Sequence, residues 1–198
     1  HPDHVAGVDA LKARTGADVL AYGAKGGMKP DRRLRDGDTI ESTEFRLRAV
    51  HTPGHASNHL CFLVEEERML IAGDHVNEGQ TVVIRPPDGD MAAYLDSLEM
   101  LRTLRLRFIA PGHGRLIEQP KQAIDDLVAH RRDREAQVLA ALRAAGTAKI
   151  TDLVEVVYAD IGDERKLIAR STVHAHLLKL ADEGVVSGKT LAGRWSIA

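Results

Sequence analysis

The segment TPGHASNH, residues 52–59, decides how this sequence is interpreted, because it places a histidine behind a proline and a glycine at the end of a predicted strand. Three other segments share its character: HPDH at 1–4, AGDH at 72–75 and APGHG at 110–114. AGDH and APGHG also follow predicted strands, whereas HPDH precedes a predicted helix. Glycine allows a sharp turn of the chain, and loops at strand ends commonly carry functional side chains. The four segments therefore predict a site at one edge of a sheet.

The residue types in these segments are those of a metal site without thiolate ligands. Histidine and aspartate bind zinc, and they also suit manganese or iron. An aspartate among the ligands could bridge two ions that hold a hydroxide between them, and two such ions can activate water at neutral pH. A single histidine after a strand more often makes only a backbone hydrogen bond, so the prediction depends on the four segments together.

The composition excludes several classes of protein. The 198 residues, 43% of them hydrophobic, suffice for one large domain or two small ones. A net charge of −2 provides no global positive field of the kind that attracts nucleic acid. The single cysteine, Cys61, excludes a cysteine-based zinc site and suits a reducing compartment, so a cytoplasmic location is expected. No apolar run approaches the roughly 20 residues of a membrane helix, so no membrane partner is expected.

Residues 1–120 are predicted to form an α/β domain in which short strands alternate with helices. Apolar residues recur at helical spacing in segments 5–14 and 91–101. Residues 22–37 are predicted to form an exposed basic loop, which more often is only a solvated surface than a phosphate-attracting edge. The basic residues of that loop are Lys25, Lys29, Arg32, Arg33 and Arg35. The predicted strands are residues 18–22, 38–42, 44–52, 59–67, 68–74 and 107–114.

Residues 121–198 are predicted to form a second, mainly helical domain. After a first helix, a second helix over 151–160 would be capped by Thr151, and a third over 171–184 by Ser171 or Thr172. A hairpin over 185–198 would follow, and this order is typical of a winged helix. The charges of this domain are nearly balanced. Packing against the catalytic domain is therefore favoured over RNA contact through Lys189 and Arg194 of the wing.

The order HPDH, TPGH, GDH and PGHG resembles the metallo-β-lactamase superfamily, whose first motif reads H-x-H-x-D-H. The resemblance covers essentially the whole chain and implies an αββα sandwich followed by the winged helix. The stretches GDHVNEGQTVVI and YLDSL, with the winged helix, are similar to the β-lactamase-like protein 2 group. Because HPDH matches only the rear of the first motif, the sandwich is expected to lack its N-terminal strands and a histidine preceding His1. A partly uncovered sheet face is expected in consequence.

The resemblance implies two metal ions, expected to be zinc, with manganese or iron as alternatives. Asp74 would bridge both ions and Asp3 would orient the attacking hydroxide, so these two are the expected catalytic residues. The first ion would be held by His1, His55, Asp74 and the leading histidine, and the second by Asp3, His4, Asp74 and His113. His59 and His75 would lie beside the ligands. His59 would hydrogen-bond or pack, and His75 would contact substrate or be a loop residue with satisfied hydrogen bonds.

Three functions remain open on the sequence alone. Members of the group that this chain resembles include single-strand endoribonucleases, so metal-dependent cleavage of a phosphodiester in single-stranded RNA is the first expectation, by family analogy. Hydrolysis of a small-molecule thioester, as in thioesterases or hydroxyacylglutathione hydrolases, is the alternative. A winged-helix binding protein without chemistry is the third. None of these fixes the oligomeric state.

Overall fold

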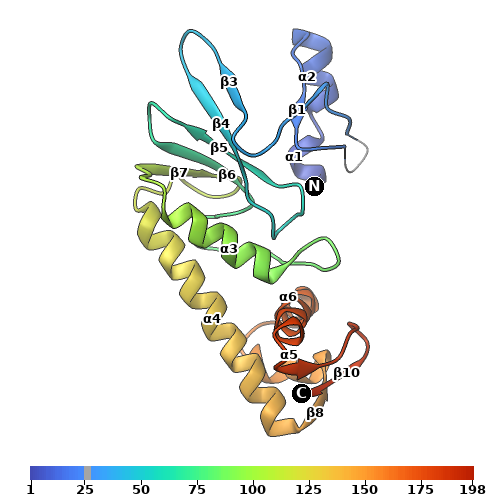
Figure 1. Ribbon diagram of the computed structural model, residues 1–198. Coiled ribbons are helices and arrows are strands. Elements are labelled where there is room, and N and C mark those ends of the chain that lie inside the picture. Colours follow the sequence, from blue (N-terminus) through green and yellow to red (C-terminus); the bar gives the residue numbers. More distant parts are fainter. Residues whose placement is uncertain (25–27) are drawn as a thin grey trace.

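The larger part of the molecule is built on a five-stranded sheet in the order β3-β4-β5-β6-β7 (Figure 1). The computed structural model describes residues 1–24 and 28–198, so Lys25 of the predicted basic loop lies outside the described residues. Neighbouring strands are antiparallel except β6 and β7, which are parallel and therefore need a crossover connection. The strands are β3 (Thr39–Glu41), β4 (Arg46–His51), β5 (Leu60–Val64), β6 (Met69–Gly73) and β7 (Phe108–Pro111).

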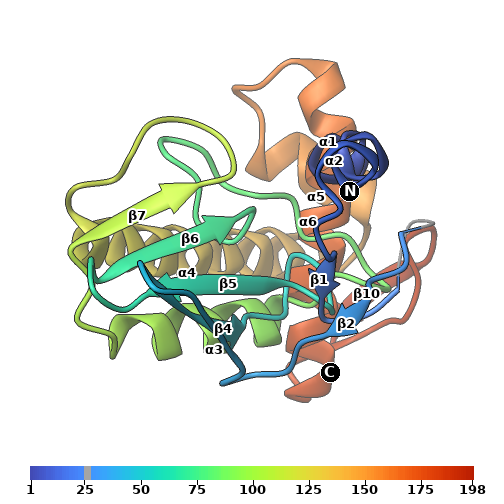
Figure 2. The same cartoon turned by 90° about the horizontal axis from the view of Figure 1, so that it is seen from above.

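Two helices, α3 (Met91–Arg102) and α4 (Pro120–Ala145), cover one face of this sheet. Side chains alternate between the two faces of a strand, so Cys61 and Leu63 of β5 are buried toward the helices. Figure 2 looks onto the opposite face, where Ile71 of β6 is 40% exposed. This partly exposed face agrees with the expectation of an incompletely covered sheet. None of the described helices is long and apolar enough to cross a bilayer.

The N-terminal segment differs from its predicted structure. The helix expected over residues 5–14 is divided into α1 (Pro2–Val5) and α2 (Val8–Thr15), with the low-propensity Gly7 between them. Three residues of HPDH lie within α1, and the segment precedes α2 as expected. The apolar face expected on this helix is not buried, since Leu11 is 62% exposed. The strand expected over 18–22 is reduced to β1 (Leu20–Ala21), which pairs with β2 (Arg32–Arg33) in the predicted loop.

The C-terminal part has three short strands and two helices after α4. Strands β8 (Thr147–Lys149), β10 (Arg194–Ile197) and β9 (Val186–Ser187) form a sheet in that order, which confirms the predicted hairpin. Helix α5 (Ile150–Val157) is preceded by Lys149, so Thr151 is not its N-cap. Helix α6 (Asp163–Asp182) begins well before Ser171. The carboxylates of Asp163 and Glu164 in its first turn stabilise this start, because they lie at the positive end of the helix dipole.

Helix α4 belongs to two hydrophobic cores. Its first half contributes Ile124, Leu127 and Val128 to the core beneath the five-stranded sheet. Its second half contributes Val138 and Leu142 to the core around Trp195, which is fully buried. The predicted domain boundary between residues 120 and 121 stays a prediction. The continuous helix means that the two parts share a rigid element.

Three polar side chains join α4 to α6 inside the second part. Glu135 accepts a hydrogen bond from the Lys179 ammonium at 2.9 Å and lies 3.1 Å from Nδ1 of His176. His176 has no exposed surface. Burial lowers the pKa of His176 below its ordinary value, although the hydrogen bond with Glu135 acts in the opposite direction.

We expect acid to destabilise the protein partly through His176. Because its pKa is lower in the folded than in the unfolded chain, the unfolded chain takes up more protons as the pH falls through about 6.5. The free energy of unfolding should therefore fall below that pH, by up to about 1.4 kcal/mol per pH unit for one fully affected histidine. Urea unfolding across this range should show a smaller pH dependence for His176→Gln than for the wild type. Equal pH dependence in both proteins would contradict this.

Candidate metal centre

All six side chains expected to bind metal converge at one edge of the five-stranded sheet. Their potential ligand atoms form two groups, and within each group these atoms lie within 4.8 Å of one another. The two groups share Asp74, as the expected bridging role requires. The first group contains Asp3, His4, Asp74 and His113, and the second contains His1, His55 and Asp74. Metal binding by these residues stays a prediction.

The first group draws its members from three distant segments. Nε2 of His4, on α1, lies 3.0 Å from Oδ2 of Asp74, which follows β6. Nε2 of His113, after β7, lies 3.3 Å from Oδ1 of Asp74 and 3.4 Å from Oδ2 of Asp3. Two ligand atoms that each lie about 2.1 Å from one tetrahedral zinc are about 3.4 Å apart. The observed spacings therefore suit a shared cation.

In the second group, the two histidines face one another through ring nitrogens beside Asp74. Nδ1 of His55 lies 2.8 Å from the carbonyl oxygen of Val83, which can only accept, so Nδ1 carries the proton. In a neutral ring, Nε2 then carries a lone pair, and it lies 3.7 Å from Oδ2 of Asp74 and 3.0 Å from Nδ1 of His1. This lone pair can accept a hydrogen bond from Nδ1 of His1 or bind a cation beside the Asp74 carboxylate. The donor set thus fits a divalent cation.

Asp74 is held in place by its neighbours. Nδ2 of Asn77 donates to Oδ1 of Asp74 at 3.2 Å. Burial by itself would raise the pKa of the Asp74 carboxyl, but the hydrogen bond from Asn77 and the nearby His4 lower it below its ordinary value. Gly112 closes the site from the other side, because a Cβ at this position would lie 3.0 Å from Oδ1 of Asp74. The carboxylate is therefore ionised and fixed.

The two further histidines of the prediction occupy different places. His59 lies beneath Gly73, next to Asp74, and its Nδ1 is 2.8 Å from Oγ1 of Thr52. Burial lowers the pKa of His59 to about 4, so its ring is neutral near pH 7. His75 has no exposed surface, and its ring packs 4.8 Å from the ring of Tyr94. A buried side chain cannot contact substrate, so packing is the role that the structure supports for His75.

Sequence reasoning missed the groups that support the ligands. Asn77 not only binds Asp74 but also accepts a hydrogen bond from the backbone N–H of His113 at 3.2 Å. Val83 contributes only its carbonyl oxygen, and Thr52 only its hydroxyl. The position of Asn77, just after AGDH, could have suggested a supporting role. A backbone carbonyl carries no such signal in the sequence, although partners of this kind orient metal-binding histidines.

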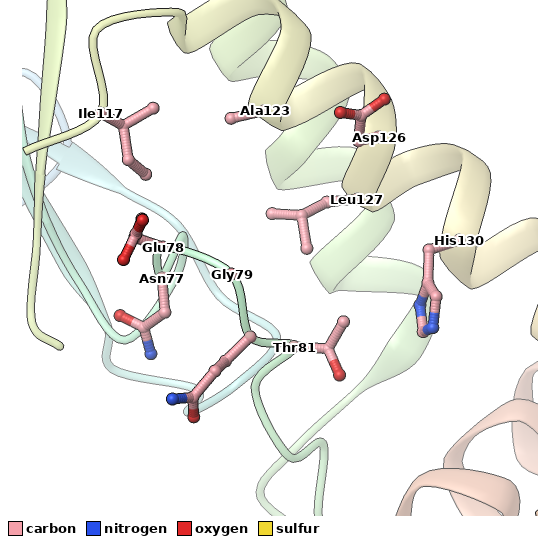
Figure 3. Close-up of a pocket in the computed structure, with 10 residues that line it drawn as sticks. Asn77, Glu78, Gly79, Thr81, Ile117, Ala123, Asp126, Leu127 and His130 are labelled. Carbon is pink, nitrogen blue, oxygen red and sulfur yellow. The ribbon is translucent and has the colours of Figure 1, made fainter. Parts of the chain in front are cut away.

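A cavity of about 520 Å³ adjoins the centre at Asn77 (Figure 3). It lies between the loop 77–81 and helix α4, with Ile117 and Leu127 among its apolar lining side chains. Its charged lining residues among those described are acidic, Glu78 and Asp126. Its volume lies in the range of small-molecule sites.

Comparison with known proteins identifies the family of this chain. Residues 1–113 match the family model of the metallo-beta-lactamase superfamily, and residues 150–195 match the beta-lactamase associated winged helix domain. The chain is 32% identical over 213 residues to the lactamase-like protein aptB of Emericella nidulans, and 30% identical over 193 residues to a beta-lactamase-like protein 2 homolog of Caenorhabditis elegans. These matches cover 100% and 94% of the chain, but only 66% and 64% of the two relatives.

A third relative and a solved structure complete the comparison. The chain is 32% identical to an atrochrysone carboxyl ACP thioesterase of Aspergillus fumigatus, over 82% of the chain and 56% of the relative. A metallo-beta-lactamase family protein from Thermus thermophilus superposes with a TM-score of 0.73 at 30% identity, over 86% of this chain and 55% of that one. The chain therefore belongs to the metallo-β-lactamase superfamily, and it carries the winged helix domain associated with that family.

Proposed function

We propose that the candidate metal centre binds two divalent cations, zinc being the expected pair, and hydrolyses a thioester. The observation that carries the proposal is the sharing of Asp74 by two groups of potential ligands, with Nε2 of His55 3.7 Å from Oδ2 of Asp74. Bound cations would supply an activated water at neutral pH and stabilise negative charge that develops in the reaction. A cytoplasmic location stays a prediction.

The chain's own residues would orient the reactants. Asp3 is 57% exposed at the mouth of the centre, where its carboxylate can accept a hydrogen bond from the attacking water. Asn77 fixes both Asp74 and the loop that carries His113, so the centre does not need to rearrange during the reaction. The neutral ring of His59 supports the turn at Gly73 from beneath.

The thioester is favoured over RNA because of the cavities at the centre. A second cavity of about 250 Å³ is lined by the ligands themselves and by apolar residues that include Leu20, Leu60 and Phe62. Neither this cavity nor the one beside Asn77 has a lysine or arginine among its described lining residues. Apart from the proposed cations, a polyanion would find no basic side chain in these cavities to pair with its other charges, whereas an uncharged acyl group would fit. The relative that is called a thioesterase also supports a thioester over RNA as the substrate. This preference reverses the first expectation from the sequence.

RNA cleavage remains the second candidate on one specific observation. Arg32 and Arg33 form β2 and are exposed, and their strand pairs with β1, whose residues line the smaller cavity. The two guanidinium groups of this strand could bind a phosphate backbone that approaches from outside the cavity.

Hydrolysis assays on the metal-loaded chain should separate the two substrates. We expect metal-dependent turnover of an acyl-N-acetylcysteamine thioester, no cleavage of a fluorogenic single-stranded RNA, and loss of thioester turnover with a chelator. The double variant Arg32→Ala, Arg33→Ala should leave thioester turnover unchanged. Metal-dependent cleavage of RNA alone, reduced by this double variant but not by the exposed control pair Arg143→Ala, Arg165→Ala, would instead establish the second candidate.

A further inference from the structure

Arg131 is a buried cation outside the metal centre. It lies on α4 with only 2% of its surface exposed, and it has no ion-pair partner within residues 1–24 and 28–198. Its Nη2 donates to the carbonyl oxygen of Val82 at 2.5 Å, and its guanidinium lies 5.2 Å from the centre of the Tyr94 ring. Burying a charge without a carboxylate partner is costly. The contacts that Arg131 makes therefore point to a specific role.

The bond to Val82 leads directly to a predicted metal ligand. Residues 81–85 form no helix or strand, so hydrogen bonds to other elements fix their path. The next carbonyl along this segment, that of Val83, accepts the hydrogen bond from Nδ1 of His55. Two consecutive carbonyls are thus anchored, one to α4 through Arg131 and one to the imidazole of His55.

The second contact of Arg131 is with Tyr94, which touches two segments next to the centre. The hydroxyl of Tyr94 donates to the carbonyl oxygen of His75 at 2.9 Å, directly after Asp74. The backbone of Tyr94 also packs against Gly54, directly before His55. Tyr94, whose ring lies beneath the Arg131 guanidinium, therefore touches two of the three segments that carry ligands of the second group, those of His55 and Asp74.

We propose that Arg131 is a positioning residue for His55. By holding the carbonyl of Val82, it places the carbonyl of Val83 where Nδ1 of His55 can donate to it, and this directs Nε2 toward Asp74 and His1. The consequence for metal affinity rests on the proposed function, whereas the orientation of the imidazole does not. Partners that orient ligands in this way typically change metal affinity by roughly 10-fold to 100-fold when they are removed.

The test compares Arg131→Met with Arg131→Lys and with a matched control in the full chain. Methionine keeps a long apolar side chain but cannot donate, whereas lysine can still donate to Val82. Val128→Ala removes buried packing from the same helix, in the core next to the site, without touching the Val82 bond. Thermal unfolding would establish that each variant folds, and Arg131→Lys decides the question if Arg131→Met does not fold.

Two readouts follow. Nitrogen-detected NMR of the metal-free chain should show the slowly exchanging Nδ1 proton of His55 in the wild type, in Val128→Ala and in Arg131→Lys, but not in Arg131→Met. Zinc affinity, measured by competition with a chromophoric chelator, should fall about 10-fold or more in Arg131→Met only. In thioester hydrolysis by Arg131→Met, kcat should fall while KM stays nearly unchanged.

The inference is overturned if Arg131→Met keeps the His55 signal, or if Val128→Ala loses it to the same extent, because Arg131 would then act only through general packing. A wild-type chain that binds no zinc but keeps the His55 signal, with loss in Arg131→Met, would contradict the proposed function and leave the positioning role supported.

Discussion

Replacing Asp74 with alanine should release at least one cation and lower the rate of hydrolysis by several orders of magnitude. Asp74 is the only residue that belongs to both groups of potential ligands found among the described residues. Two cations together lower the pKa of a bound water to roughly 7, and one cation without its bridging carboxylate provides less of this effect. Metal analysis by mass spectrometry and steady-state kinetics on the same preparation would measure both consequences.

Asp74→Asn separates the charge of this residue from its shape. The amide should keep the fold, since Asn77 and His4 still have a polar partner, but it removes the negative charge between the two groups. We expect the melting temperature of Asp74→Asn to change little, whereas its rate of hydrolysis should fall strongly. Asp9→Asn, at an exposed position on α2, provides the control for removal of one carboxylate. Full metal content together with full activity in Asp74→Ala would refute a binuclear mechanism.

Gly54→Ala should destabilise the protein by about 3 kcal/mol or more, or prevent folding. A Cβ at Gly54 would lie 2.3 Å from Cα of Tyr94, so helix α3 would have to move as a whole. The residue also has a φ of +137°, which alanine adopts only with strain. Because His55 follows directly, any variant that folds should also bind metal more weakly.

The matched control is Gly37→Ala. Gly37 also has a positive φ, +80°, but a Cβ there would meet nothing within 4 Å. The substitution should cost only about 1 kcal/mol, from backbone conformation alone. Chemical denaturation of the two variants would therefore measure the steric contribution of the Gly54 contact. Equal losses of unfolding free energy would contradict the close packing of α3 on the TPGH turn.

Local pattern in the sequence was sufficient for the framework of the site. Runs of apolar residues define β4, β5 and β6, and glycine or proline at the ends of β4 and β6 turns the chain where a ligand is needed. The six predicted ligands therefore converge as expected at one edge of the sheet. Helix beginnings were less predictable: polar residues such as Ser171 occur inside helices as well as at caps, so Asp163 was missed as the start of α6.

The support of the site was decided only by tertiary structure. Arg131 and Arg132 are neighbours in the same charged stretch, yet Arg131 is 2% exposed while the side chain of Arg132 is 67% exposed and pairs with Glu99. A rotation of about 100° per residue around the helix axis separates them. The sequence by itself determined which residues could bind metal, because ligand chemistry belongs to the side chain. Which groups hold those ligands in place depended on the packing of α4 and α3 beneath the sheet, which brings together residues far apart in the chain.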